Sequence, residues 1–143
     1  MSNFLMEHGL LLEQANLAVS FALVGLIWTI QLVHYPSFAY VADDCFHQFE
    51  RFHVRAISFI VMPLMITELI LAIVLSFLSM FNPLILTSFC IVLLIWGSTF
   101  LLSVPCHNKL AHGKDLAVIK RLVRTNWIMT ILWSAKPAIL FFA

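Results

Sequence analysis

Charged residues are scarce in this sequence. Only 10% of its 143 residues are charged, whereas 62% are hydrophobic, and the mean hydropathy is +1.01. This composition excludes an ordinary soluble domain, in which about 25% of the residues are charged. The few basic residues form no broad patch with interleaved aromatic residues, which argues against a nucleic-acid-binding surface. We therefore expect a protein whose main partner is the lipid bilayer.

Helix breakers are also scarce, and long apolar runs take their place. A helix needs roughly 20 apolar residues to cross the hydrocarbon core. The last apolar run, residues 126–142, has about 17 residues and is at the short end of the usual range for such helices. Pro63 predicts a kink in the second run, whereas Pro83 and Pro105 predict where the third begins and stops. The predicted fold is all-α: a single integral membrane four-helix bundle over residues 1–143, with spans at about 10–34, 57–81, 84–104 and 126–142.

Basic residues are nearly absent from one end of this bundle. An even number of spans places both termini at one end, the terminal end, together with the turn 79–83. The connections 35–56 and 105–125 form the other, basic end. By the positive-inside rule the basic end is cytoplasmic, so both termini lie on the non-cytoplasmic side of an inner membrane. No Lys or Arg precedes the first run, so no cleaved signal peptide is expected. The basic end holds seven of the eight Lys and Arg residues: Arg51, Arg55, Lys109, Lys114, Lys120, Arg121 and Arg124.

The two basic-end connections each predict a helix. Residues 42–56 contain no breaker, and Asp43 and Asp44 are good N-cap residues for a helix that enters the second span. Residues 115–124 alternate apolar and basic side chains with helical spacing, which predicts an amphipathic helix at the membrane interface.

Histidine is concentrated at the basic end. His47, Glu50 and His53 are three residues apart and share one side of the predicted helix. The pair Glu50-x-x-His53 matches the carboxylate and imidazole pair of di-metal bundles. His34 and His107 arrive at the same end from two other helices. We predict a metal site of His34, His47, Glu50, His53 and His107, or a haem held by His34, His53 and His107.

Other interpretations of these residues remain open. Interfacial histidines are often only solvated, which we expect of His112, and Glu50 could pair with a nearby Arg or Lys. Disulfides are disfavoured on the cytoplasmic side, so Cys45 and Cys106 are free thiols or ligands. Together with His47 and His107 they would form a soft site for zinc or cuprous copper, which is the less favoured alternative.

A few polar residues lie deep within the apolar runs. Gln31, Glu68, Asn126 and Lys136 are predicted to face the bundle interior, because a lone charge in lipid is costly. We expect Glu68 to pair with Lys136 or to be protonated. Glu68 is about 22 Å along the helix from His53, so it belongs to a different site.

These features predict a redox protein. An iron, copper or haem centre near lipid suits the oxidation of a hydrophobic substrate or electron transfer. The first alternative is a small transporter or channel that uses Glu68 and Lys136, which would form a homo-oligomer. The second is a non-catalytic accessory subunit of a larger membrane complex.

Several short motifs resemble a group of small four-helix bacterial membrane proteins. They are Gln31-Leu-Val-His34-Tyr35-Pro36, His53, Glu68, the segment Val104-Pro105-Cys106-His107-Asn108-Lys109-Leu110, and Asn126-Trp127. The resemblance covers most of the chain and implies the same fold, but it implies no assigned activity. In size and helix number alone, the chain is also similar to anthrone-oxygenase-like membrane proteins.

Overall fold

The chain folds into four long helical rods, which a computed structural model describes for residues 2–80 and 82–142, with side chains from residue 9 onward. The first rod comprises the helix α1 (Ser2–Thr29), the π-helix η1 (Ile30–His34), the short helix α2 (Tyr35–Ser37) and the 3-10 helix η2 (Phe38–Tyr40). The second is α3 (Asp43–Leu78). The third joins α4 (Pro83–Ser98), the π-helix η3 (Thr99–Ser103) and α5 (Val104–Leu110). The fourth is α6 (Leu116–Phe141).

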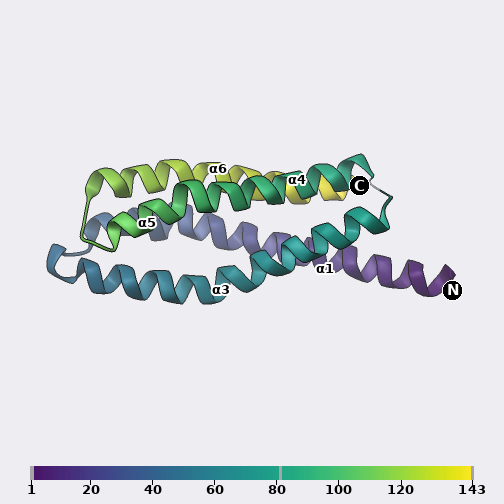
Figure 1. Cartoon of the computed structure of the whole chain (residues 1–143), viewed down its shortest axis with the longest axis horizontal. Helices are drawn as coiled ribbons and strands as arrows, with labels where there is room; N and C mark the ends of the chain where they lie inside the picture. The colour runs from purple at the N-terminus through teal and green to yellow at the C-terminus, as the bar shows by residue number, and fades with distance from the viewer. Residues whose placement is uncertain (1, 81, 143) are drawn as a thin grey trace.

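The rods run side by side as an elongated bundle (Figure 1). Helix α1 packs against α3 and α6, and α4 packs against the same two neighbours. Both ends of the chain and the turn between α3 and α4 lie at one end of the bundle, whereas the other two connections lie at the opposite end (Figure 1). The predicted all-α four-helix bundle is therefore confirmed. The side of the membrane on which the termini lie stays a prediction.

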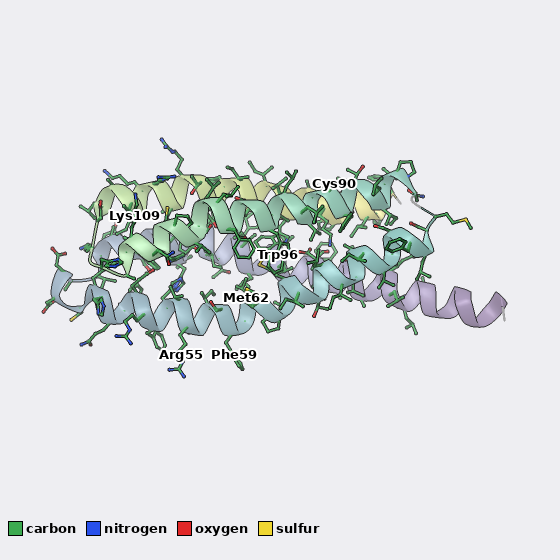
Figure 2. All side chains as sticks on the ribbon, in the orientation of Figure 1. Arg55, Phe59, Met62, Cys90, Trp96 and Lys109 are labelled. Carbon is green, nitrogen blue, oxygen red and sulfur yellow. The ribbon has the colours of Figure 1, made fainter. Side chains whose placement is uncertain are left out.

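Three of the rods are long and apolar enough to cross a membrane: Gly9–Tyr40, Asp43–Leu78 and Pro83–Leu110. Large apolar side chains cover their outer surfaces, as Phe59, Leu101 and Phe77 illustrate. Phe59 and Arg55 point away from the bundle in Figure 2. A surface of this kind is stable against lipid chains, whereas in water it would be a large exposed apolar patch.

Helix boundaries differ from the predictions at two places near the basic end. Pro105 does not stop the third rod, because it lies in the first turn of α5, where a missing N–H costs little. Residues 116–124 do not form a separate interfacial helix but are the start of the continuous α6. Their apolar residues Ile119 and Leu122 are buried in the bundle core, which aligns this segment with the other rods.

Caps and prolines otherwise set the helix limits. Asp115 caps α6 by accepting hydrogen bonds from the backbone N–H groups of Ala117 and Val118. The N-cap of α3 is Ala42, so Asp43 and Asp44 lie in its first turn rather than at the cap. Their charge still favours that end of the helix through its dipole. Helix α3 changes direction near its middle in Figure 1, and Pro63 is the proline within it.

Candidate functional site

Three rods bring three histidines together at the basic end. His34 ends η1, His53 is in α3 and His107 is in α5. The Nε2 atom of His34 lies 2.6 Å from the Nδ1 atom of His53. The ring centroid of His53 lies 4.5 Å from that of His34 and 5.4 Å from that of His107. A hydrogen bond this short requires one of the first two rings to donate its N–H to a lone pair of the other.

A carboxylate and a phenol extend the cluster through His107. His107 Nδ1 lies 2.7 Å from Glu50 Oε1, and His107 Nε2 lies 3.1 Å from the hydroxyl of Tyr35. Glu50 is fully buried and Tyr35 nearly so. In the neutral tautomer that this geometry favours, His107 donates Nδ1–H to Glu50 and accepts the Tyr35 O–H. Glu50, His107 and Tyr35 thus form a continuous chain of proton-carrying groups. We call these five residues (His34, Tyr35, Glu50, His53 and His107) the histidine cluster.

Two buried atoms of the cluster have no hydrogen-bond partner. They are Glu50 Oε2 and His53 Nε2, which lie on the same face of α3 one turn apart. A buried unpaired polar atom costs about 1–3 kcal/mol, so natural proteins retain few of them. If His53 donates its Nδ1–H to His34, its Nε2 atom keeps a free lone pair. Both unpaired atoms are then available to a ligand that accepts electron pairs.

Aromatic rings enclose the cluster on its outer side. The ring of Phe38 lies 5.0 Å from that of His53, and Phe49 stacks on His53 with an angle of 16° between the rings. Phe38 and Phe46 are completely buried. These rings help to bury His53, whereas His34 and His107 are half-buried, so the electrostatic interactions are strongest around the His53 ring.

Each π-helical segment lies next to a histidine of the cluster. The segment η1 ends at His34, and η3 ends four residues before His107. A π turn contains one more residue than an α turn, so it rotates the side chains that follow it relative to a regular helix. Such turns often occur at functional sites. Neither segment has a recognisable sequence signal.

Several predicted ligands lie outside the cluster. His47 and Cys45 are exposed, whereas Cys106 is buried, so the proposed soft four-ligand site is not assembled. His112, which is expected to be a solvated histidine rather than a ligand, is exposed, and its Nδ1 atom lies 2.8 Å from the backbone oxygen of Asn108. Among the described residues, no three or more His, Cys, Asp or Glu side chains are placed to hold a metal ion.

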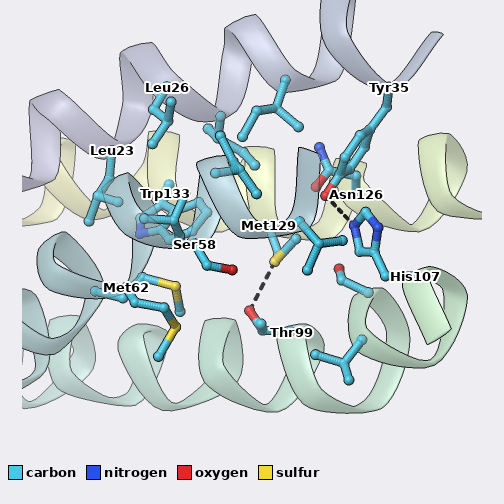
Figure 3. Close-up of a pocket in the computed structure, with 18 of the residues that line it drawn as sticks. Leu23, Leu26, Tyr35, Ser58, Met62, Thr99, His107, Asn126, Met129 and Trp133 are labelled. Atoms are coloured by element: carbon cyan, nitrogen blue, oxygen red, sulfur yellow. Dashed lines mark hydrogen bonds between the residues drawn. The ribbon is translucent and has the colours of Figure 1, made fainter. Parts of the chain in front are cut away.

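A largely apolar cavity adjoins the cluster. It lies between α1, α3, the third rod and α6, has a volume of about 200 Å³, and is partly open to the outside. Tyr35, His107 and Asn126 line one part of it, as Figure 3 shows together with the hydrogen bond between Tyr35 and His107. A second hollow, which Glu50 helps to line, shares the lining residues Val54, Ser58, His107 and Asn108 with the cavity.

A second polar cluster lies towards the terminal end. Lys136 Nζ donates hydrogen bonds to Glu68 Oε1 (2.8 Å), Ser20 Oγ (2.8 Å) and Asn16 Oδ1 (3.0 Å). Trp133 Nε1 donates to the other oxygen of Glu68 at 3.0 Å. The structure thus shows the Glu68–Lys136 pair that the sequence predicts. All three protons of the ammonium group have acceptors, so this buried charge is fully compensated.

Gln31, in η1, connects the first rod to α6 between the two clusters. Its Nε2 donates to the backbone oxygen of Val123, and its Oε1 accepts from Asn126 Nδ2 at 2.8 Å and from Thr130 Oγ1 at 3.3 Å. Gln31 and Asn126 are both buried. The predicted polar residues of the first and fourth spans therefore lie together inside the bundle.

Sequence reasoning missed Tyr35, although its position directly after His34 was a usable signal. No known family model matches the chain, and neither a curated protein nor a solved structure shows significant similarity to it. The function of the chain must therefore be inferred from its own residues.

Proposed function

We propose that this chain is a multi-pass inner-membrane protein with a redox centre at its basic end, where it oxidises a hydrophobic substrate or transfers electrons. The unpaired Glu50 Oε2 and His53 Nε2 atoms are the observation that supports this most directly. A Glu-x-x-His pair offers one carboxylate oxygen and one imidazole nitrogen to a metal. In this chain those are the two atoms that no other group uses.

A metal ion suits this arrangement better than a haem does. Iron or copper accepts mixed imidazole and carboxylate ligands, and His34 would orient His53 through the hydrogen bond to its other ring nitrogen. The imidazole rings lie 4.5 and 5.4 Å apart, which leaves no room for a macrocycle between them as they stand. Two ligands do not complete a site, so water, substrate or a turned His107 ring would supply the rest.

Analysis of the purified protein for iron, copper and zinc, together with its ultraviolet–visible spectrum, tests this proposal. We expect bound iron or copper without a Soret band, and a large loss of metal in His53→Ala, Glu50→Gln and His34→Ala. His112→Ala is the matched control, because this exposed histidine should keep the full metal content. Circular dichroism should show that every variant remains helical.

Three results would change or overturn the proposal. A Soret band that disappears in His53→Ala would replace the metal with a haem. Equal metal content in all variants would place the metal elsewhere. A colourless protein without metal would remove the redox function.

A transport function is the second candidate, and one observation favours it. A hollow at the terminal end is lined by polar residues that include Glu13, Gln14 and Asn16. Asn16 also binds the buried Lys136, so this hollow approaches the Glu68–Lys136 pair. Proton or ion flux into proteoliposomes that disappears in Glu68→Gln, but not in His53→Ala, would support this candidate.

A further inference from the structure

The cavity beside the histidine cluster is shaped for an apolar molecule. Leu23, Ile27, Met62, Met65 and Trp133 line much of it. The cavity, with a volume of about 200 Å³, has the apolar walls and the few fixed polar groups that are typical of small-molecule sites. The thioethers of Met62 and Met65 and the indole of Trp133 are groups that pack well against the aromatic ring of a ligand.

The cavity opens sideways between two rods. The lining residues Val54, Ser58 and Met62 of α3 and Val104 and Asn108 of α5 are exposed on the bundle surface. Val54, Met62 and Val104 are apolar, and they belong to rods that are long enough to cross a membrane. Lipid chains would surround such an opening, so a membrane-dissolved molecule could enter without passing through water.

One buried polar atom in the lining has no partner. The Oδ1 atom of Asn126 has no hydrogen bond, although the residue is only 1% exposed. The orientation of its amide is fixed by Gln31, which donates Nε2–H to Val123 and so presents an oxygen to Asn126. Asn126 must therefore direct its N–H₂ group at Gln31, and its oxygen remains an acceptor without a donor. A ligand with an O–H group would satisfy it.

Tyr35 offers a second acceptor in the same cavity. Its hydroxyl hydrogen is directed at His107 Nε2 when His107 donates its Nδ1–H to Glu50, which leaves lone pairs on the Tyr35 oxygen. Both polar groups therefore accept hydrogen bonds. A ligand that carries only acceptors, such as an ether, would leave Asn126 Oδ1 unpaired.

We propose that the cavity binds an amphiphile with an apolar body and a hydroxyl-bearing aromatic head group of the phenol class, which enters from the lipid. The hydroxyl donates to Asn126 Oδ1, and the ring and tail pack against the apolar walls. This inference rests on the proposed function only in regarding the bound molecule as the substrate, because the binding itself requires no metal.

Calorimetric titration of the protein in nanodiscs tests the site with two matched probes, para-hexylphenol and its methyl ether para-hexylanisole. The ether has the same ring and tail but no O–H group. After subtraction of the signal from empty nanodiscs, we expect the phenol to bind about three- to tenfold more tightly than the ether. Equal binding of the two probes would overturn the assignment of a donor head group.

Two pairs of variants locate the binding. Val104→Trp fills the mouth of the cavity and should abolish binding, whereas Leu101→Trp changes an exposed residue outside the lining and should not. Asn126→Leu should remove the preference for the phenol. Its control Thr130→Val removes a bond to the same Gln31 oxygen but leaves Asn126 Oδ1 in place, so the preference should remain.

The results of these experiments distinguish failure of the binding site from failure of the redox function. Unchanged binding in Val104→Trp would overturn the cavity as the site, even if Asn126→Leu did not fold. Metal content is measured on the same preparations. Phenol binding by a protein without metal or haem would support the cavity and remove the redox function. A metal-containing protein that binds neither probe would overturn the cavity as a binding site and support the redox function.

Discussion

The buried pair of Lys136 and Glu68 makes opposite predictions for two substitutions of similar size. Lys136→Met removes the positive charge that pairs with Glu68, and it takes away the donor that Glu68 Oε1 and Asn16 Oδ1 share. Breaking a buried ion pair from one side costs about 3–5 kcal/mol, because the remaining charge is stranded. Glu68→Gln leaves the positive charge with three oxygen acceptors: Asn16, Ser20 and the new amide.

The loss of stability expected for Glu68→Gln follows from the contacts that the new side chain keeps. The amide oxygen can still accept from Lys136, but its N–H₂ group then faces the Trp133 N–H, so one donor pair is unsatisfied. The cost of such a mismatch is about 1–3 kcal/mol. We therefore expect Lys136→Met to be the more destabilising by about 2 kcal/mol, or about 6 °C in Tm.

Thermal unfolding in nanodiscs, followed by near-ultraviolet circular dichroism, measures this difference. Lys120→Met is the matched control on the same helix, because Lys120 is exposed and should change the stability by no more than about 0.5 kcal/mol. The double variant of Lys136 and Glu68 should lose less than the sum of the two single losses, since no carboxylate is stranded in it. If Glu68→Gln had the lower Tm, or if the two losses were additive, the ion-pair reasoning would be refuted.

Three further predictions concern the fold and its orientation. Gln31→Leu should lower the free energy of unfolding by about 2 kcal/mol, because the side chains of Asn126 and Thr130 lose their shared acceptor; the exposed Gln14→Leu is its control, and equal melting of the two variants would contradict the bridge. Asp115→Ala should cost about 1 kcal/mol through loss of the α6 cap, with Asp115→Asn keeping most of the stability in the same melting assay. A C-terminal alkaline phosphatase fusion should be active and a C-terminal fluorescent protein dark, since the positive-inside rule places the terminal end outside the cytoplasm; the reverse pattern would invert the topology.

The fold could be predicted because lipid leaves the chain few alternatives. Long apolar runs must satisfy their backbone hydrogen bonds internally, so they form helices, and the distribution of Lys and Arg indicates how the helices alternate. The ends of the helices were less predictable. Pro105 and residues 115–124 carry the local signals of a stop and of a surface helix. The third rod nevertheless continues past Pro105 with Cys106 and Leu110 buried in the core, and burial of Ile119 and Leu122 makes residues 116–124 part of α6.

The histidine cluster could be predicted only in part, for a geometric reason. Sequence spacing indicates that His34, Glu50, His53 and His107 reach the same end of the bundle. It does not indicate which side of its helix each residue occupies once a π turn has changed the register. His47 shows a separate limit, because six residues place it about 120° around α3 from His53, and it is exposed while His53 is buried. The cavity has no sequence signal at all, because it arises where four rods fail to fill the space between them.

The hydrogen bonds of the buried polar groups distinguish what stabilises this bundle from what is available to a ligand. Helices in lipid gain little from the hydrophobic effect when they associate, so buried polar contacts and close packing must hold them together. Gln31 and the Lys136–Glu68 pair meet this need: Lys136, for example, uses all three of its donors within the protein. The unpaired Glu50 Oε2, His53 Nε2 and Asn126 Oδ1 atoms do not contribute to stability in this way, because each costs free energy while it has no partner. These three belong to the histidine cluster or to the cavity beside it, whereas the other unpaired buried side-chain atoms of the described residues, on Ser88, Trp96 and Ser98, lie on α4. Cohesion alone gives a bundle no reason to keep an unpaired carboxylate, imidazole and amide so close together at its basic end, whereas binding of a ligand there does.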